Sequence, residues 1–129
     1  MFGFVRKISS RVFVPAAWTL LTIMLLCLPG SAIPDVSMYQ VPHVDKIVHF
    51  LLFGGIPFFW SLYVLPKFSR AESVKIVIGF CLFSIALGTA LEYVQFYFVA
   101  NRDFEVVDIF ADSLGAICFG ALVLLTRKN

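Results

Sequence analysis

Four long apolar segments occupy most of this 129-residue chain and limit what it can fold into. A helix needs ~20 mostly apolar residues to cross the hydrocarbon core of a bilayer, within a range of ~17–25. Segments of this length are too long for the strands of a membrane barrel, so we interpret them as helices whose backbone groups bond internally. The segments run from about Val12 to Pro29, from Asp45 to Leu65, from Val74 to Val99 and from Val106 to Thr126.

The composition supports a membrane protein and excludes several other classes. Apolar residues make up 60% of the chain and charged residues 14%, against ~45–50% and ~25% in ordinary soluble domains. This excludes a soluble enzyme and a disordered tail, and a net charge of +2 is too small for a nucleic-acid-binding domain. We therefore predict one all-α membrane domain over residues 1–129, with four transmembrane helices. Cys27, Cys81 and Cys118 lie within apolar runs, which predicts buried free thiols.

The first apolar segment also has features of a signal peptide. A basic start precedes it, and Gly30-Ser31-Ala32 after it resembles a small-residue cleavage site. Its apolar run is longer than the ~7–15 residues of a signal peptide, and three more segments follow. We expect it to be retained as a helix, with cleavage as the alternative.

The distribution of basic residues predicts the orientation, because cytoplasmic loops of membrane proteins carry an excess of Lys and Arg. The other side has only Lys46 and Arg102. Both termini are therefore expected in the cytoplasm. The eight basic residues on the predicted cytoplasmic side are Arg6, Lys7, Arg11, Lys67, Arg70, Lys75, Arg127 and Lys128.

Polar residues in or beside the last three segments all fall toward the predicted outer side. Charged groups are expensive in a bilayer, so they usually face the interior of a helix bundle and indicate function. Several of these residues are three or four positions apart, which places them on one helix face. We predict that they converge in one outward-facing pocket, and the candidate site residues are Asp45, Lys46, His49, Glu92, Gln95, Arg102, Asp108 and Asp112.

Small residues continue these polar faces inward, and small residues allow close helix approach in lipid. The polar faces are therefore expected to be the packed faces. A salt-bridge network that only holds the helices together is the alternative interpretation, with Arg102 as the expected partner of Glu92 or Asp112. The two stripes are Ser84, Gly88 and Glu92, and Asp108, Asp112 and Gly115.

Short motifs over about residues 28–120 resemble the VanZ-like family of small bacterial integral membrane proteins. Asp45-Lys46-Ile47-Val48-His49-Phe50 is similar to the family's Asp-Lys-x-x-His-Phe pattern, and Glu92-Tyr93-Val94-Gln95 to its Glu-x-x-Gln pattern. Arg102-Asp103-Phe104-Glu105, followed by Asp108, resembles Arg-x-Phe-[Asp/Glu]-x-x-Asp. Position 112 departs from the pattern, with Asp in place of Asn. Gly120 follows Gly115 by five residues where four are expected.

The resemblance implies a multi-pass protein of the bacterial cytoplasmic membrane, in a family linked to resistance to the glycopeptide teicoplanin. Our first functional hypothesis is a cell-envelope factor whose polar pocket binds an envelope lipid or a peptide-type ligand. The second is an intramembrane enzyme that uses carboxylates and His49 as acid–base groups on a lipid-linked envelope precursor. The third is a proton-coupled transporter that uses Glu92 and His49 as a relay.

The sequence indicates few specific partners beyond these. The expected partners are membrane lipids and an envelope precursor or glycopeptide, with no nucleic acid, and an oligomer is compatible with the chain. Carboxylates with one intramembrane His are a weak metal signal, so we assign no metal ligands, no cofactor and no catalytic residue from the sequence.

Overall fold

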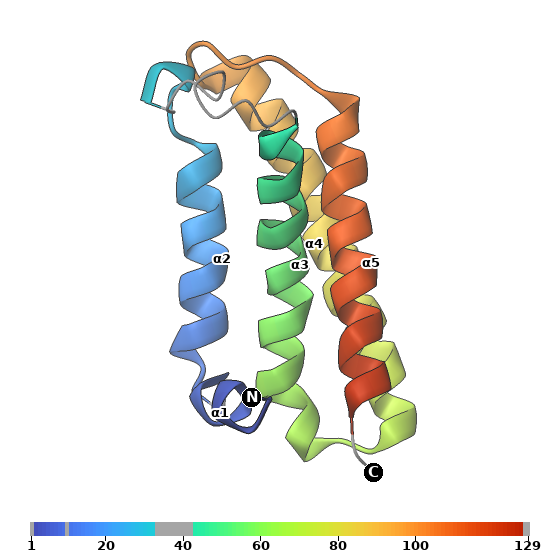
Figure 1. The fold of residues 1–129 in the computed structure, drawn as a ribbon. Helices are drawn as coiled ribbons and strands as arrows, with labels where there is room; N and C mark the ends of the chain where they lie inside the picture. The colour runs from blue at the N-terminus through green and yellow to red at the C-terminus, as the bar shows by residue number, and fades with distance from the viewer. Residues whose placement is uncertain (1, 10, 33–42, 128–129) are drawn as a thin grey trace.

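The protein is a bundle of antiparallel helices in a computed structural model (Figure 1). The structure describes residues 2–9, 11–32 and 43–127. The predicted all-α fold is confirmed. Helix α1 and the end of α5 lie at the same end of the bundle, together with the α3–α4 connection, whereas the end of α2, the start of α3 and the α4–α5 connection lie at the opposite end. The described elements are α1 (Phe2–Ser9), α2 (Phe13–Leu26), η1 (Gly30–Ala32), α3 (Val44–Val64), η3 (Leu65–Lys67), α4 (Arg70–Phe98) and α5 (Val106–Thr126).

Three helical segments are long and apolar enough to cross a membrane: Val44–Lys67, Arg70–Phe98 and Val106–Thr126. The first predicted segment is shorter than expected, because α2 has only 14 residues, about 21 Å at 1.5 Å per residue. It ends at Leu26, and Pro29 follows closely. A proline disfavours helical backbone in the residue before it, which accounts for the early end.

Helix α4 begins four residues before the predicted start. Ser69 forms a capping box with Glu72: the Ser69 hydroxyl accepts from the Glu72 N–H, and the Glu72 carboxylate accepts from the Ser69 N–H. These two contacts satisfy backbone donors that the first turn would otherwise leave unpaired. The helix therefore extends over 29 residues, from Arg70 to Phe98.

Helix α3 lies at the centre of the bundle and contains a buried proline, Pro57. Because proline has no N–H, the carbonyl of Phe53 one turn earlier loses its helical donor. The Ser84 hydroxyl of α4 donates to this carbonyl at 2.7 Å. The small polar residue predicted on the packed face of α4 thus replaces the missing hydrogen bond and fastens α4 to α3.

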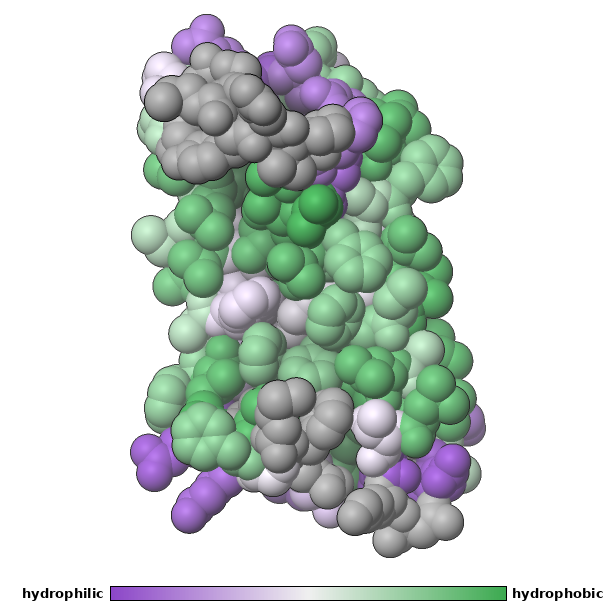
Figure 2. Space-filling model, viewed as in Figure 1, coloured by the Kyte–Doolittle hydropathy of each residue, from purple (hydrophilic) through white to green (hydrophobic). Residues whose placement is uncertain are grey.

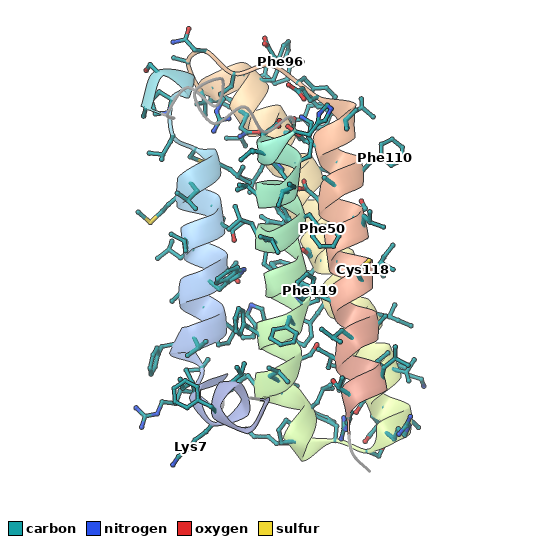
Figure 3. All side chains as sticks on the ribbon, in the orientation of Figure 1. Lys7, Phe50, Phe96, Phe110, Cys118 and Phe119 are labelled. Carbon is teal, nitrogen blue, oxygen red and sulfur yellow. The ribbon has the colours of Figure 1, made fainter. Side chains whose placement is uncertain are left out.

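Helices α3 and α5 approach each other through glycine. A Cβ added to Gly115 would lie 2.9 Å from the carbonyl carbon of Phe50 and 3.0 Å from its Cα, closer than side chains can pack. One turn further along, Phe50 and Phe119 meet edge to face with ring centres 5.8 Å apart (Figure 3). Glycine at position 115 therefore sets the spacing of the two helices that carry most of the polar residues.

Helix α2 is attached to α3 mainly by Trp18. The indole N–H of Trp18 donates to the carbonyl of Leu52 at 2.9 Å, and the ring lies over Gly55, where a Cβ would collide with it. A second indole, Trp60 of α3, donates to the hydroxyl of Thr19 at 3.0 Å. The two indoles therefore fasten the middle of α2 to α3.

The face of the bundle seen in Figure 2 is mostly apolar across its middle, with hydrophilic residues toward both ends. Phe110, for example, points away from α5 and is 69% exposed (Figure 3). The three thiols are free as predicted, but Cys27 and Cys118 are exposed and Cys81 is only half-buried. The predicted burial of Cys27 and Cys118 was wrong, because in this chain apolar residues cover the surface as well as the core.

Candidate functional site

The predicted polar residues gather at the end of the bundle opposite the termini. They come from the first turns of α3 and α5, the last turns of α4 and the α4–α5 loop. His49, Glu92 and Asp112 lie about 8–9 Å inward from their helix ends, at 1.5 Å per residue, and all three are buried. The structure brings together, as a polar cluster, Asp45, Lys46, His49, Glu92, Glu105, Asp108 and Asp112.

Lys46 is the centre of the outer part of the cluster. Its ammonium lies 2.6 Å from the carboxylate of Asp45 and 2.5 Å from Oδ1 of Asp108, and it also contacts the carboxylate of Glu105. Its side chain is 17% exposed. A single lysine thus ties the start of α3 to the start of α5 and to the loop before it. Glu105, which the sequence analysis placed in a motif and not among the site residues, belongs to this contact set.

His49 lies deeper, between two carboxylates of α5. Its Nδ1 is 2.8 Å from Oδ1 of Asp112, a hydrogen-bond distance, and its Nε2 is 3.6 Å from Oδ2 of Asp108. The residue is 5% exposed. Asp108 and Asp112 are four residues apart, so one face of α5 presents both carboxylates to the imidazole.

Gly88 provides the space for Asp112. A Cβ at position 88 would lie 2.5 Å from Oδ2 of Asp112. The predicted stripes therefore meet as expected, with the small residues of α4 opposite the acidic face of α5. Ser84, Gly88, Glu92, Asp108, Asp112 and Gly115 are all buried.

Glu92 reaches the cluster from α4. Its Oε2 accepts a hydrogen bond of 3.1 Å from the backbone N–H of Glu105, which ties the α4–α5 loop to α4. Its other oxygen, Oε1, is buried and has no hydrogen-bond partner among the described residues, and the same holds for Oδ2 of Asp112. Both side chains are 1% exposed. One buried carboxylate oxygen on α4 and one on α5 therefore receive no hydrogen bond from the part of the chain that the structure describes.

Two predicted site residues, Gln95 and Arg102, form their hydrogen bonds outside the polar cluster. The amide of Gln95 donates to the carbonyl of Leu26 at 2.9 Å, and Nε of Arg102 donates to the carbonyl of Leu28 at 3.3 Å. Both bonds satisfy carbonyls at or just beyond the end of α2, which a helix leaves unpaired. The expectation that Arg102 pairs with Glu92 or Asp112 is wrong, since Arg102 bonds to Leu28 and, of the described lysines and arginines, Lys46 contacts the cluster.

The cluster is suited to proton transfer or to cation binding. His49, Glu92 and Asp108 bring one potential ligand atom each to within 4.8 Å of one another, and all three are buried. A second group, Asp45, Glu105 and Asp108, is as compact but more exposed, and Lys46 already contacts each of its members.

No family model, curated protein or solved structure matches this chain.

Proposed function

We propose that this chain is a multi-pass protein of the bacterial cytoplasmic membrane, with four transmembrane helices and both termini in the cytoplasm. Three long apolar helices, the apolar surface and the basic residues near the termini and the α3–α4 connection support this. Helix α2 is short, but apolar residues on either side of it, such as Val12 and Leu28, lengthen its apolar segment. A modest difference between the length of this apolar segment and the thickness of the bilayer is accommodated by local thinning of the bilayer.

We further propose that the polar cluster is the functional site of a VanZ-like cell-envelope factor and binds the polar headgroup of an envelope lipid or a peptide-type ligand. The observation that carries this proposal is the pair of buried oxygens, Oε1 of Glu92 and Oδ2 of Asp112, for which the described part of the chain supplies no donor. A network selected only to fasten helices would be expected to satisfy its own acceptors, because an unpaired buried polar group is costly. In the proposed orientation the cluster lies on the outer side, where envelope precursors and glycopeptides are found.

An intramembrane enzyme is the second candidate function. The imidazole of His49 lies between Asp108 and Asp112, an arrangement that orients a histidine for general acid–base catalysis. The substrate would be a lipid-linked envelope precursor. A proton-coupled transporter is a weaker third candidate, because the cluster lies at one end of the bundle and not at mid-depth.

The experiment that tests the proposal is complementation of a deletion strain, with glycopeptide sensitivity as the first phenotype. We expect Glu92→Gln and His49→Asn to abolish complementation while the amount of protein in the membrane stays near that of the wild type. Asp103→Asn is the matched control: it removes a charge from an exposed residue in the α4–α5 loop and should complement fully. Full complementation by both site variants would contradict the proposal, and parallel loss of protein and phenotype would favour a purely structural network.

A further inference from the structure

The inner part of the cluster carries more negative charge than its described partners neutralise. Lys46 contacts Asp45, Glu105 and one oxygen of Asp108. Farther inside, Glu92 and Asp112 are both 1% exposed, and each retains a carboxylate oxygen that has no hydrogen-bond partner within residues 2–9, 11–32 and 43–127. Burying an ionised carboxylate is expensive unless a positive group or a metal compensates it. The interior of the cluster therefore favours an additional positive charge.

The spacing of the donors suits a metal ion. Nε2 of His49 and Oδ2 of Asp108 are 3.6 Å apart, which is too long for a hydrogen bond. Two ligand atoms that bind the same ion, each at ~2.1 Å from it, lie roughly 3–4 Å from each other. The separation of Nε2 and Oδ2 therefore fits neighbouring ligands of a single cation. Glu92 supplies a third atom within 4.8 Å of the others, from the carboxylate whose Oε1 has no partner among the residues that the structure describes. The three ligands come from three different helices, α3, α4 and α5.

The contact between His49 and Asp112 is the second feature that points to a metal. A histidine that binds a metal through one ring nitrogen nearly always donates the N–H of its other nitrogen to a carboxylate or carbonyl, which orients the ring. Asp112 occupies this position at 2.8 Å from Nδ1, which leaves the lone pair of Nε2 directed to the side of Asp108. Gly88 makes this arrangement possible, because a side chain there would displace the carboxylate of Asp112.

We infer that His49, Glu92 and Asp108 form a site for a divalent transition-metal cation, Zn²⁺ or Mn²⁺, with Asp112 as the residue that positions His49. One imidazole and two carboxylates are a donor set that both ions accept. Three protein ligands leave a coordination position open, which would take an oxygen of the headgroup that binds at the cluster. The inference deepens the proposed function and rests on it for the nature of that headgroup, whereas the metal site itself depends only on the geometry of the cluster.

The test is metal binding by the purified full-length protein in detergent, with any affinity tag removed. After treatment with a chelator, the protein is titrated separately with Zn²⁺ and Mn²⁺ by isothermal calorimetry, and its melting temperature is measured with and without each ion. We expect one equivalent of at least one of the two ions to bind and to raise the melting temperature. If the wild-type protein binds neither ion stoichiometrically, the inference is wrong, whatever the behaviour of the variants.

Three ligand variants and one control locate the site. His49→Gln, Glu92→Gln and Asp108→Asn should each weaken binding at least ~10-fold, whereas Asp103→Asn, which also removes one negative charge but lies in the exposed loop, should bind as the wild type does. Equal binding by all four variants would place the ion elsewhere and overturn the inference. Because metal binding is read from an isotherm, the metal site and the proposed function can fail independently. If the protein is an envelope factor without a metal, the isotherm shows no binding but Glu92→Gln still fails to complement the deletion strain.

Discussion

Replacing Gly115 by alanine tests whether the close approach of α3 and α5 holds both the fold and the site together. The atoms that a Cβ at position 115 would meet belong to the backbone of Phe50, at 2.9 Å from its carbonyl carbon and 3.0 Å from its Cα. Backbone atoms in a central helix cannot rotate away as a side chain can. The two helices must therefore move apart by several tenths of an ångström or more, and His49, one residue before Phe50, moves with α3.

The magnitude follows from two opposing effects. Forcing an extra carbon into a packed interface costs about 1–3 kcal/mol, and the upper part of this range applies where backbone is the obstacle. Alanine in place of glycine within a helix returns up to about 1 kcal/mol through its higher helix propensity. We expect Gly115→Ala to lower the free energy of unfolding by about 2 kcal/mol, and to weaken the 2.8 Å contact between His49 and Asp112.

The assay is unfolding by SDS titration in mixed micelles, followed by far-ultraviolet circular dichroism. Gly79→Ala in α4 is the matched control, because a Cβ there would have no atom within 4 Å. It should leave stability unchanged or raise it by up to about 1 kcal/mol. If Gly115→Ala proved as stable as Gly79→Ala, the packing of α3 against α5 described above would be refuted.

Two further predictions concern the attachment of α2 and the orientation. Trp18→Phe keeps an aromatic ring over Gly55 but loses the bond to the carbonyl of Leu52, so the same SDS titration should show a loss of about 1 kcal/mol, and no change would mean that this bond does not hold α2. For the orientation, single cysteines at Asn101 and Ala71, in a background without the three native cysteines, report exposure to an impermeant thiol reagent. Intact cells should label Asn101→Cys but not Ala71→Cys, and the reverse pattern would overturn the proposed orientation.

The presence of each long helix could be predicted from the length of its apolar segment, whereas the positions of some helix ends depended on local chemistry. The predicted range of α5 agrees with the structure, and that of α3 differs by one residue at each end. The start of α4 was missed because hydropathy falls before Val74, yet the Ser69-x-x-Glu72 spacing is a capping-box pattern that a search for helix starts would have found. The end of α2 was also readable, from Pro29.

The convergence of the site was predictable for a similar reason. Residues three or four apart share a helix face, so the positions of His49, Glu92 and Asp112 already placed them on packed faces at similar depth. The pairing within the cluster was not predictable. Lys46 was expected in the pocket and Arg102 in the loop beside it, but the residue spacing does not show which groups their long side chains contact. Which carboxylate or carbonyl each of them reaches depends on how the helix ends and the α4–α5 loop are placed relative to one another, and that is a property of the tertiary structure.

Asp112 is one of the two places where the sequence departs from the VanZ-like pattern, and the structure gives that departure a physical meaning. An asparagine there would still offer an oxygen to Nδ1 of His49, so the hydrogen bond alone does not require an acid. The aspartate adds a negative charge, and its Oδ2 lies against Gly88 without a donor among the described residues. With Asp112, the cluster holds five carboxylates and one lysine, which favours a second positive charge, from His49 itself, from a proton or from a bound cation. The aspartate that departs from the pattern therefore also supplies the oxygen that has no donor among the described residues. Asp112 thus contributes to the charge balance of the site as well as to the orientation of His49.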